Sequence, residues 1–179
     1  MKTIVNTSVK TLENGIRSVL INDPKSYNSL SSVTLKSLLV VFKTLNKDNK
    51  TKVIILEGAG KGFSAGHNLK ELKKFKKKNE YKKLFNLCSE LMLEIVEGRK
   101  PVIAKVHGSA FAAGCQLAAS CDLALSTNDA MFATPGVNIG LFCSTPMVAV
   151  SRKVSKKRMM KMLLTGDPIT AQHAKEIGL

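Results

Sequence analysis

The stretch His107-Gly108-Ser109-Ala110-Phe111-Ala112-Ala113-Gly114-Cys115-Gln116 decides how this chain of 179 residues is interpreted. A similar small-residue turn, Phe63-Ser64-Ala65-Gly66-His67-Asn68-Leu69, lies earlier in the chain. Each turn follows a β-branched run that predicts a buried strand, and each opens a predicted helix. The first amide protons of a helix have no partner within it and carry the positive end of its dipole. Because the side chains here are mostly small, a ligand oxygen can reach these amides. Two such turns facing one point predict a backbone oxyanion hole, suited to a thioester carbonyl that becomes an enolate.

The rest of the chain alternates predicted strands with predicted helices. Residues 4–9 and 16–21 predict a β-hairpin whose type I′ turn lies at Glu13-Asn14-Gly15. Ser31 and Ser32 can cap a helix that ends at 46–49. This alternation favours βαβ units and an α/β fold. No linker or repeat divides the chain, so we expect one domain over residues 1–179. Strands are predicted at 53–56, 102–106 and 122–126, and residues 131–141 predict a short strand and an irregular loop. Helices are predicted near 80–97, 113–120, 146–154, 157–164 and 171–177.

The composition, with 44% hydrophobic residues, is typical of a globular protein. No apolar stretch approaches the roughly 20 residues that a membrane-spanning helix needs, so we expect no membrane partner. The first eight residues contain neither an apolar signal region nor the arginines of a transit peptide. We therefore expect a cytoplasmic protein.

The four cysteines, Cys88, Cys115, Cys121 and Cys143, form no CxxC pair and lie among apolar neighbours. Buried free thiols are the favoured interpretation. The three histidines form neither an HxxxH nor an HxH pair, so we expect no metal site.

The formal net charge is +15, and eight lysines fall between Lys70 and Lys83. A second basic run covers residues 152–161. These runs fit either a solvated surface or attraction of a polyanion, which is a phosphate-bearing ligand or a nucleic acid. The chain has two Tyr and no Trp, which argues against stacking of nucleic-acid bases. Nucleic acid therefore stays a less favoured partner.

At these motifs the chain resembles the crotonase superfamily, also called the enoyl-CoA hydratase/isomerase family. The resemblance implies a spiral of ββα units that assembles as a homotrimer or hexamer. It implies an acyl-CoA thioester as ligand, with coenzyme A as part of the substrate and no separate cofactor. It also implies that the C-terminal helical part of the fold is truncated after Leu179. The segments that carry it follow the family order: 22–30, 63–72, 100–122, 132–146 and 164–179.

The resemblance also assigns roles to residues of the two turns. The backbone amides of His67 and Ala113 would form the oxyanion hole. The main chain around Lys25–Tyr27 and Ala65–Leu69 would contact the adenine and pantetheine parts of coenzyme A. The substrate-binding candidates are Lys25, Tyr27, Ala65, Gly66, Asn68, Leu69, Ala112, Gln116, Pro135, Gly136 and Leu141.

The chain departs from the family pattern where hydration needs a base and an acid. The resemblance places one glutamate three residues after the second oxyanion amide and another directly after Pro135, but this chain has Gln116 and Gly136 there. Loss of one general acid–base group costs roughly 10²–10⁴-fold in rate, so we expect little ordinary hydratase activity. Only two carboxylates, Glu71 and Asp122, lie within or beside the motifs. Whether the chain is an enzyme stays open, and the alternative is a non-catalytic RNA- or protein-binding member of the same fold.

Overall fold

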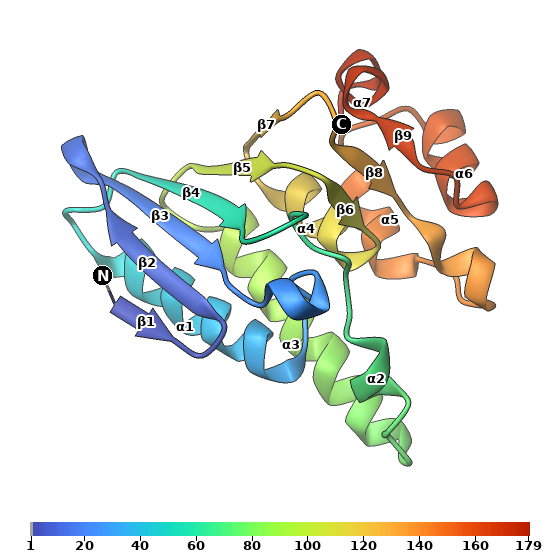
Figure 1. Ribbon diagram of the computed structural model, residues 1–179, viewed down its shortest axis with the longest axis horizontal. Helices are drawn as coiled ribbons and strands as arrows, with labels where there is room; N and C mark the ends of the chain where they lie inside the picture. Colours follow the sequence, from blue (N-terminus) through green and yellow to red (C-terminus); the bar gives the residue numbers. More distant parts are fainter. Residues whose placement is uncertain (1) are drawn as a thin grey trace.

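The computed structural model describes residues 2–179 and contains two β-sheets and several helices (Figure 1). The strands are β1 (Lys2–Ile4), β2 (Thr7–Thr11), β3 (Ile16–Ile21), β4 (Val53–Gly58), β5 (Val102–Val106), β6 (Ser109–Phe111), β7 (Leu123–Ser126), β8 (Met131–Ala133) and β9 (Ile169–Thr170). The α-helices are α1 (Ser32–Lys47), α2 (Leu69–Leu72), α3 (Lys78–Val96), α4 (Ala113–Ser120), α5 (Ser144–Val150), α6 (Lys156–Thr165) and α7 (Ala171–Ile177). Short 3₁₀ turns are η1 (Glu13–Gly15), η2 (Pro24–Ser26) and η3 (Pro135–Ile139).

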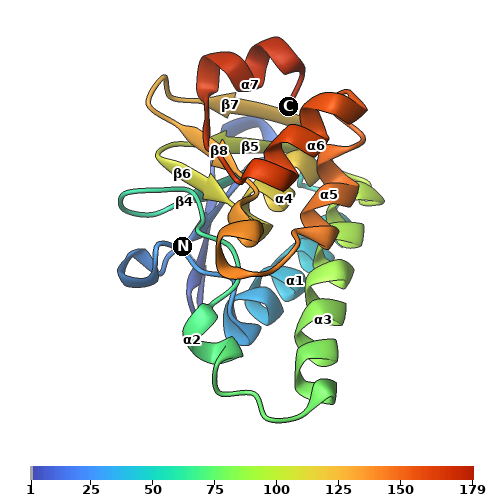
Figure 2. The same cartoon turned by 90° about the vertical axis from the view of Figure 1, so that its right-hand side faces the viewer.

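The larger sheet has the strand order β1-β2-β3-β4-β5-β7. Its first three strands are antiparallel, whereas β3, β4, β5 and β7 run parallel. The second sheet has the order β6-β8-β9. Helices α1 and α3 pack together on one side of the larger sheet, while α5, α6 and α7 lie at the other end of the molecule (Figures 1 and 2). The expected α/β class is confirmed.

The structure confirms the predicted turn of the hairpin but not the predicted start of its first strand. Asn14 and Gly15 both have positive φ, at 56° and 83°, and the Ile16 N–H donates to Glu13 O, as a type I′ turn requires. Ile4, however, belongs to the separate strand β1, because the chain turns at Asn6, which has a φ of 56°. The short strands β1, β6 and β9 were not predicted, because two or three residues show no periodicity.

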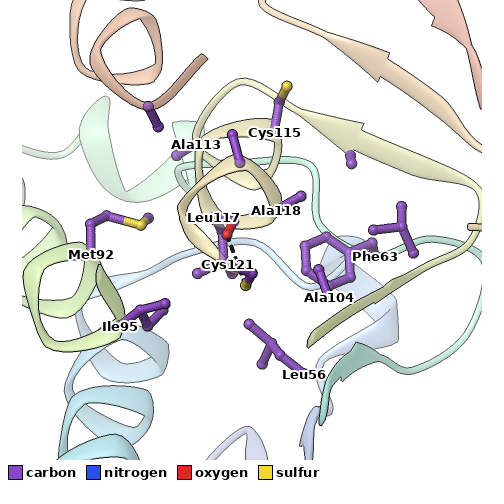
Figure 3. Packing of buried hydrophobic residues seen from close by; sticks show 14 of the residues in the cluster. Leu56, Phe63, Met92, Ile95, Ala104, Ala113, Cys115, Leu117, Ala118 and Cys121 are labelled. Carbon is purple, nitrogen blue, oxygen red and sulfur yellow. Dashed lines mark hydrogen bonds between the residues drawn. The ribbon is translucent and has the colours of Figure 1, made fainter. Parts of the chain in front are cut away.

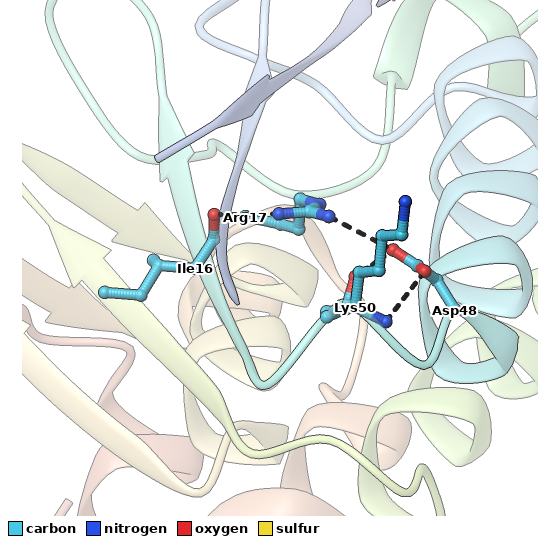
Figure 4. A network of polar contacts seen from close by, with 5 residues as sticks. Ile16, Arg17, Asp48 and Lys50 are labelled. Carbon is cyan, nitrogen blue, oxygen red and sulfur yellow. Dashed lines mark hydrogen bonds and ion pairs between the residues drawn. The ribbon is translucent and has the colours of Figure 1, made fainter. Parts of the chain in front are cut away.

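The helices begin close to where their patterns predict. The Ser31 hydroxyl accepts the Thr34 N–H at 3.2 Å and so caps α1. At the other end of α1, Asp48 accepts bonds from Thr51 Oγ1, the Lys50 N–H and Arg17 Nη2 at 2.7, 2.9 and 3.2 Å. Figure 4 shows how Arg17 reaches across from β3 to this corner. These partners, the Thr51 hydroxyl first, hold the pKa of Asp48 below its usual range.

The core is organised around α4, whose eight residues are all buried. Small side chains on α4 let other elements approach closely, and Figure 3 shows Leu117 and Ala118 of this helix among Leu56, Met92 and Ile95. The four cysteines are buried and free, as predicted. Within residues 2–179, no helix combines the length and the apolar character that crossing a membrane would require.

Asn28 joins the segment after β3 to the first small-residue turn. Its side chain is fully buried, and its φ of 54° is one that Asn tolerates better than most residues. The Nδ2 group donates to Ala59 O and Gly62 O at 2.7 and 2.8 Å, and Oδ1 accepts the Asp23 N–H at 2.9 Å. The Asn28 carbonyl also accepts the Ser64 hydroxyl at 2.9 Å. One side chain therefore fixes the backbone that leads into the turn.

We expect Asn28→Ala to lower the free energy of unfolding by about 3 kcal/mol, because it leaves buried backbone groups without partners. Urea denaturation measures this change. The exposed Asn128→Ala is the control and should stay within about 0.5 kcal/mol of the parent protein. Equal losses in the two variants would contradict the role of Asn28.

Candidate functional site

The first small-residue turn is extended, and its backbone pairs with two other segments of the chain. Its N-terminal half pairs with the start of β6, through Phe63 N–H to His107 O and Ser64 N–H to Ser109 O at 2.9 and 3.0 Å. Its C-terminal half pairs with residues 27–30, through Ala65 N–H to Tyr27 O and Leu30 N–H to Gly66 O at 2.9 and 2.8 Å. His67 lies in this bridge, two residues before α2, which has only four residues. The first turn opens a helix as predicted, because α2 begins at Leu69 with Asn68 as its N-cap, but the His67 amide belongs to the bridged segment before that helix and not to its first turn.

The second turn leads from β6 into α4 through Ala112. Its N–H donates to Ala133 O at 2.9 Å, which ties the turn to β8. Ala112 has a φ of 49° and a ψ of −118°, outside the regions that L-residues favour. Such backbone costs on the order of 1–3 kcal/mol and concentrates at functional sites. This conformation redirects the chain so that Ala113 becomes the first residue of α4.

The two turns meet at Gly66. A Cβ atom built on Gly66 would lie 2.9 Å from Ala113 N, 2.8 Å from Phe111 O and 3.0 Å from Ala112 Cβ. Gly66 also has a φ of 88°, so only glycine suits this position without strain. His67 is the next residue, and its amide is therefore brought near that of Ala113. Within residues 2–179, neither the His67 N–H nor the Ala113 N–H donates to a protein acceptor.

The His67 side chain packs against Leu30 and Phe85. Its ring meets the Phe85 ring edge-on, with centroids 5.2 Å apart and planes at 82°, and Nδ1 lies 3.3 Å from Leu30 O. Burial lowers the pKa of His67 below its usual range, although the Leu30 contact and the charge of Glu71 act in the opposite sense. Its Nε2 atom is buried and has no partner in the described part of the chain. The ring is thus held neutral near pH 7.

Gln116 lies one helical turn after Ala113 on α4, on the same side of the helix. Its side chain is 6% exposed, and Oε1 has no hydrogen-bond partner among residues 2–179. An unsatisfied buried amide oxygen costs about 1–3 kcal/mol unless a ligand or water reaches it. The position expected for the first glutamate therefore holds a neutral group with spare hydrogen-bonding capacity.

Gly136, at the position expected for the second glutamate, has no room for a side chain. A Cβ atom there would lie 2.8 Å from Cys143 Sγ and 2.9 Å from Leu141 O. The Gly136 N–H donates to Cys143 Sγ at 3.3 Å. Burial raises the pKa of the Cys143 thiol, opposed by that N–H, so the sulfur is not an activated nucleophile. The sequence indicated that the carboxylate is missing, but not that a sulfur atom occupies the adjoining space.

The remaining candidates divide between the two turns and the η3 loop. Asn68 caps α2, since its Oδ1 accepts the Glu71 N–H at 3.0 Å. Pro135 begins η3, and Leu141 is exposed on the loop that follows. Tyr27 O accepts the Ala65 N–H at 2.9 Å. The candidates that are exposed in and before the first turn are Lys25, Tyr27, Ala65 and Leu69.

The other polar groups near the motifs have structural partners. Glu71 Oε2 accepts the Ser32 N–H at 2.9 Å and helps to cap α1. Asp122 Oδ2 accepts the Val102 N–H at 2.7 Å and anchors the start of β5. His107 Nε2 lies 2.8 Å from Gly60 O. The eight lysines between Lys70 and Lys83 are exposed, and none of them forms a salt bridge within residues 2–179.

This fold and this pair of turns define a class of proteins. The chain belongs to the enoyl-CoA hydratase/isomerase family, whose model matches residues 11–179. Among curated proteins, it is 47% identical over 173 residues to enoyl-CoA hydratase domain-containing protein 3, mitochondrial, of Homo sapiens, covering 97% of this chain and 57% of that protein. It is 35% identical over 167 residues to enoyl-CoA hydratase, mitochondrial, of Pongo abelii, covering 93% of this chain and 57% of that protein.

Solved structures confirm the crotonase-like fold. An enoyl-CoA hydratase of Mycobacterium smegmatis superimposes with a TM-score of 0.95 at 45% identity, covering 97% of this chain and 67% of that one. The human enoyl-CoA hydratase domain-containing protein 3 superimposes with a TM-score of 0.93 at 47% identity, covering 97% of this chain and 68% of that one. The chain thus spans 57% of the length of the curated relatives named above.

The expected cytoplasmic location is wrong. Both curated relatives named above are called mitochondrial. The expectation rested on the composition of the first eight residues alone.

The lowered pKa of His67 predicts a pH dependence of stability. Acid protonates unfolded histidine, with a pKa near 6.5, before it protonates the buried ring. The stability that neutral His67 contributes is therefore present above that value and is lost as pH falls through the folded pKa. We expect the melting temperature to fall less steeply with acid in His67→Phe than in the parent protein. Parallel curves from thermal unfolding below pH 6.5 would contradict a buried neutral ring.

Proposed function

We propose that the chain binds an acyl-CoA thioester and stabilises its enolate with the backbone N–H groups of His67 and Ala113. The observation that carries this proposal is the close approach at Gly66, 2.9 Å from its Cβ position to Ala113 N, beside two amides without protein acceptors in the described residues. Two preorganised donors in a site that excludes water can stabilise developing charge strongly. Membership of the enoyl-CoA hydratase/isomerase family supports the same ligand class.

The exposed surface beside the first turn suits the coenzyme part of this ligand. Tyr27 O accepts the Ala65 N–H, and Lys25 lies two residues earlier, so two exposed side chains stand beside the first turn. The lysines of residues 70–83 add positive charge that attracts phosphates. Exposed charges of this kind raise the rate of encounter more than the affinity.

We do not propose that the chain hydrates an enoyl thioester in the ordinary way. It requires proton transfer, and Gln116 and Gly136 supply no acid or base. His67 is a neutral ring with a buried Nε2, and Glu71 is used by the Ser32 amide. We propose that the chain holds and polarises a thioester without an acid–base pair of carboxylates.

A homotrimer or hexamer is proposed for the assembly. Large apolar side chains are exposed at the end of η3 and on the loop after it, and burial in an interface would remove them from water. They are Ile139, Leu141 and Phe142.

Gly66→Ala tests the pair of amides. The added methyl group would stand 2.9 Å from Ala113 N, so we expect roughly tenfold weaker binding of acetoacetyl-CoA. The near-ultraviolet absorbance of its enolate reports both binding and enolate stabilisation. Gly178→Ala is the control, because Gly178 has the same φ of 88° and lies at the end of α7. Unchanged enolate absorbance in folded Gly66→Ala would sink the proposed oxyanion hole.

Crotonyl-CoA tests the missing acid–base pair. We expect the parent protein to hydrate it barely above background, and Gln116→Glu to raise the rate by roughly 10- to 100-fold. Adding Gly136→Glu should give no further increase by itself, because its Cβ atom would lie 2.8 Å from Cys143 Sγ and 2.9 Å from Leu141 O, and Cys143→Ala would relieve only the first of these contacts. The absorbance of the enoyl thioester measures turnover. A parent protein as fast as an ordinary hydratase would refute the argument from Gln116 and Gly136.

A further inference from the structure

A groove of about 310 Å³ runs between α3, α4 and α5 and starts at Gln116. Its walls are apolar along most of their length. The wall from α3 is Met92, Leu93 and Val96, and the wall from α4 and α5 includes Ala119 and Val148. Leu93, Val96 and Val148 are exposed there, at 51%, 48% and 48%.

The groove begins at a buried polar group that lacks a partner. Gln116 is 6% exposed, lines the groove, and leaves Oε1 unsatisfied among residues 2–179. Gln116 lies one helical turn after Ala113, so the part of the groove that Gln116 lines is one turn of α4 from the proposed oxyanion amide of Ala113. A ligand bound at that amide would therefore have its acyl chain at the mouth of the groove.

The far end of the groove is cationic. Arg152 and Lys153 line it, together with the single carboxylate of Asp122. That carboxylate already accepts the Val102 N–H at 2.7 Å, and Lys153 Nζ lies 3.5 Å from Cys121 O at the end of α4. The Arg152 guanidinium has no protein acceptor within residues 2–179. The two cations at this end of the groove therefore exceed the single carboxylate by one positive charge.

We propose that this groove is an acyl subsite selective for thioesters whose acyl chain ends in a carboxylate, with Arg152 and Lys153 as its binding residues. The assignment rests on the proposed function, since it continues the path of a thioester bound at Ala113. From Ala113 to Cys121 the rise of α4 is about 12 Å, so the chain must be of medium length. A methyl end would meet two cations and displace their water, whereas a carboxylate would pair with them.

The test compares suberyl-CoA with octanoyl-CoA, which have the same number of acyl carbons and differ in the terminal group. We expect suberyl-CoA to bind about five- to tenfold more tightly in isothermal titration calorimetry at moderate salt. The double variant Arg152→Met/Lys153→Met should lose this preference, because the suberyl carboxylate loses its partners and the octanoyl methyl end no longer displaces water from two cations. Lys156→Met/Lys157→Met is the matched control, because it removes the same charge from exposed positions outside the groove. It should keep the preference.

Other outcomes distinguish the subsite from the function on which it rests. Equal binding of both thioesters, or a preference that survives in Arg152→Met/Lys153→Met, overturns the subsite and leaves acyl-CoA binding intact. Failure of both thioesters to bind overturns the proposed function itself. A preference lost at protein concentrations where light scattering shows a dimer indicates that a second copy fills the groove, and this also overturns the subsite.

Discussion

The candidate site depends on one buried side chain that joins two stretches of backbone. Asn28 satisfies Asp23, Ala59 and Gly62 at once, and its own carbonyl receives the Ser64 hydroxyl. Because Ala59 and Gly62 lie more than thirty residues after Asn28, these bonds set the position of the whole first turn and not only a local bend. Loops without such bonds sample many conformations, and a backbone donor is useful only where its direction is constant.

The second turn obtains its rigidity from burial. All eight residues of α4 are covered, so the helix cannot shift without disturbing the packing around Leu117. The strained backbone of Ala112 persists because Ala133 on one side and the covered helix on the other hold it in place. Small residues bring the two turns together, since any side chain at Gly66 would meet Phe111 and Ala113.

Much of this architecture follows from patterns in the amino-acid sequence. The apolar stripe of α3 predicts a helix over about 80–97, and the structure has Lys78–Val96. Long periodic segments carry enough information for this, whereas β6 and β9, with three and two residues, are defined by their partners in the sheet. The two turns were identified from their small residues. The sequence also shows that Gln116 and Gly136 stand where the family motif has glutamate, because this comparison needs only single positions.

Other features depend on contacts between distant segments and have no local signal. Asn28 stands in a stretch of polar residues that looks like any turn, and only its partners reveal its role. The first turn was expected to open a helix with a useful N-terminus, but α2 has a single turn and His67 lies before it. Arg152 and Lys153 belong to a basic run whose sequence predicts solvated surface. In the structure they line one groove together with residues of α3.

The contact between Gly136 and Cys143 also constrains how such a protein can change over generations. A glutamate introduced at position 136 meets the sulfur at once, so that substitution alone is selected against in a folded chain. A smaller residue at position 143 relieves only part of this crowding, because Leu141 O still stands 2.9 Å from the new Cβ atom, and by itself it brings no catalytic benefit. A return from this sequence to a two-carboxylate site therefore requires the backbone around Leu141 to shift as well as a change at position 143, and neither change alone supplies the second carboxylate.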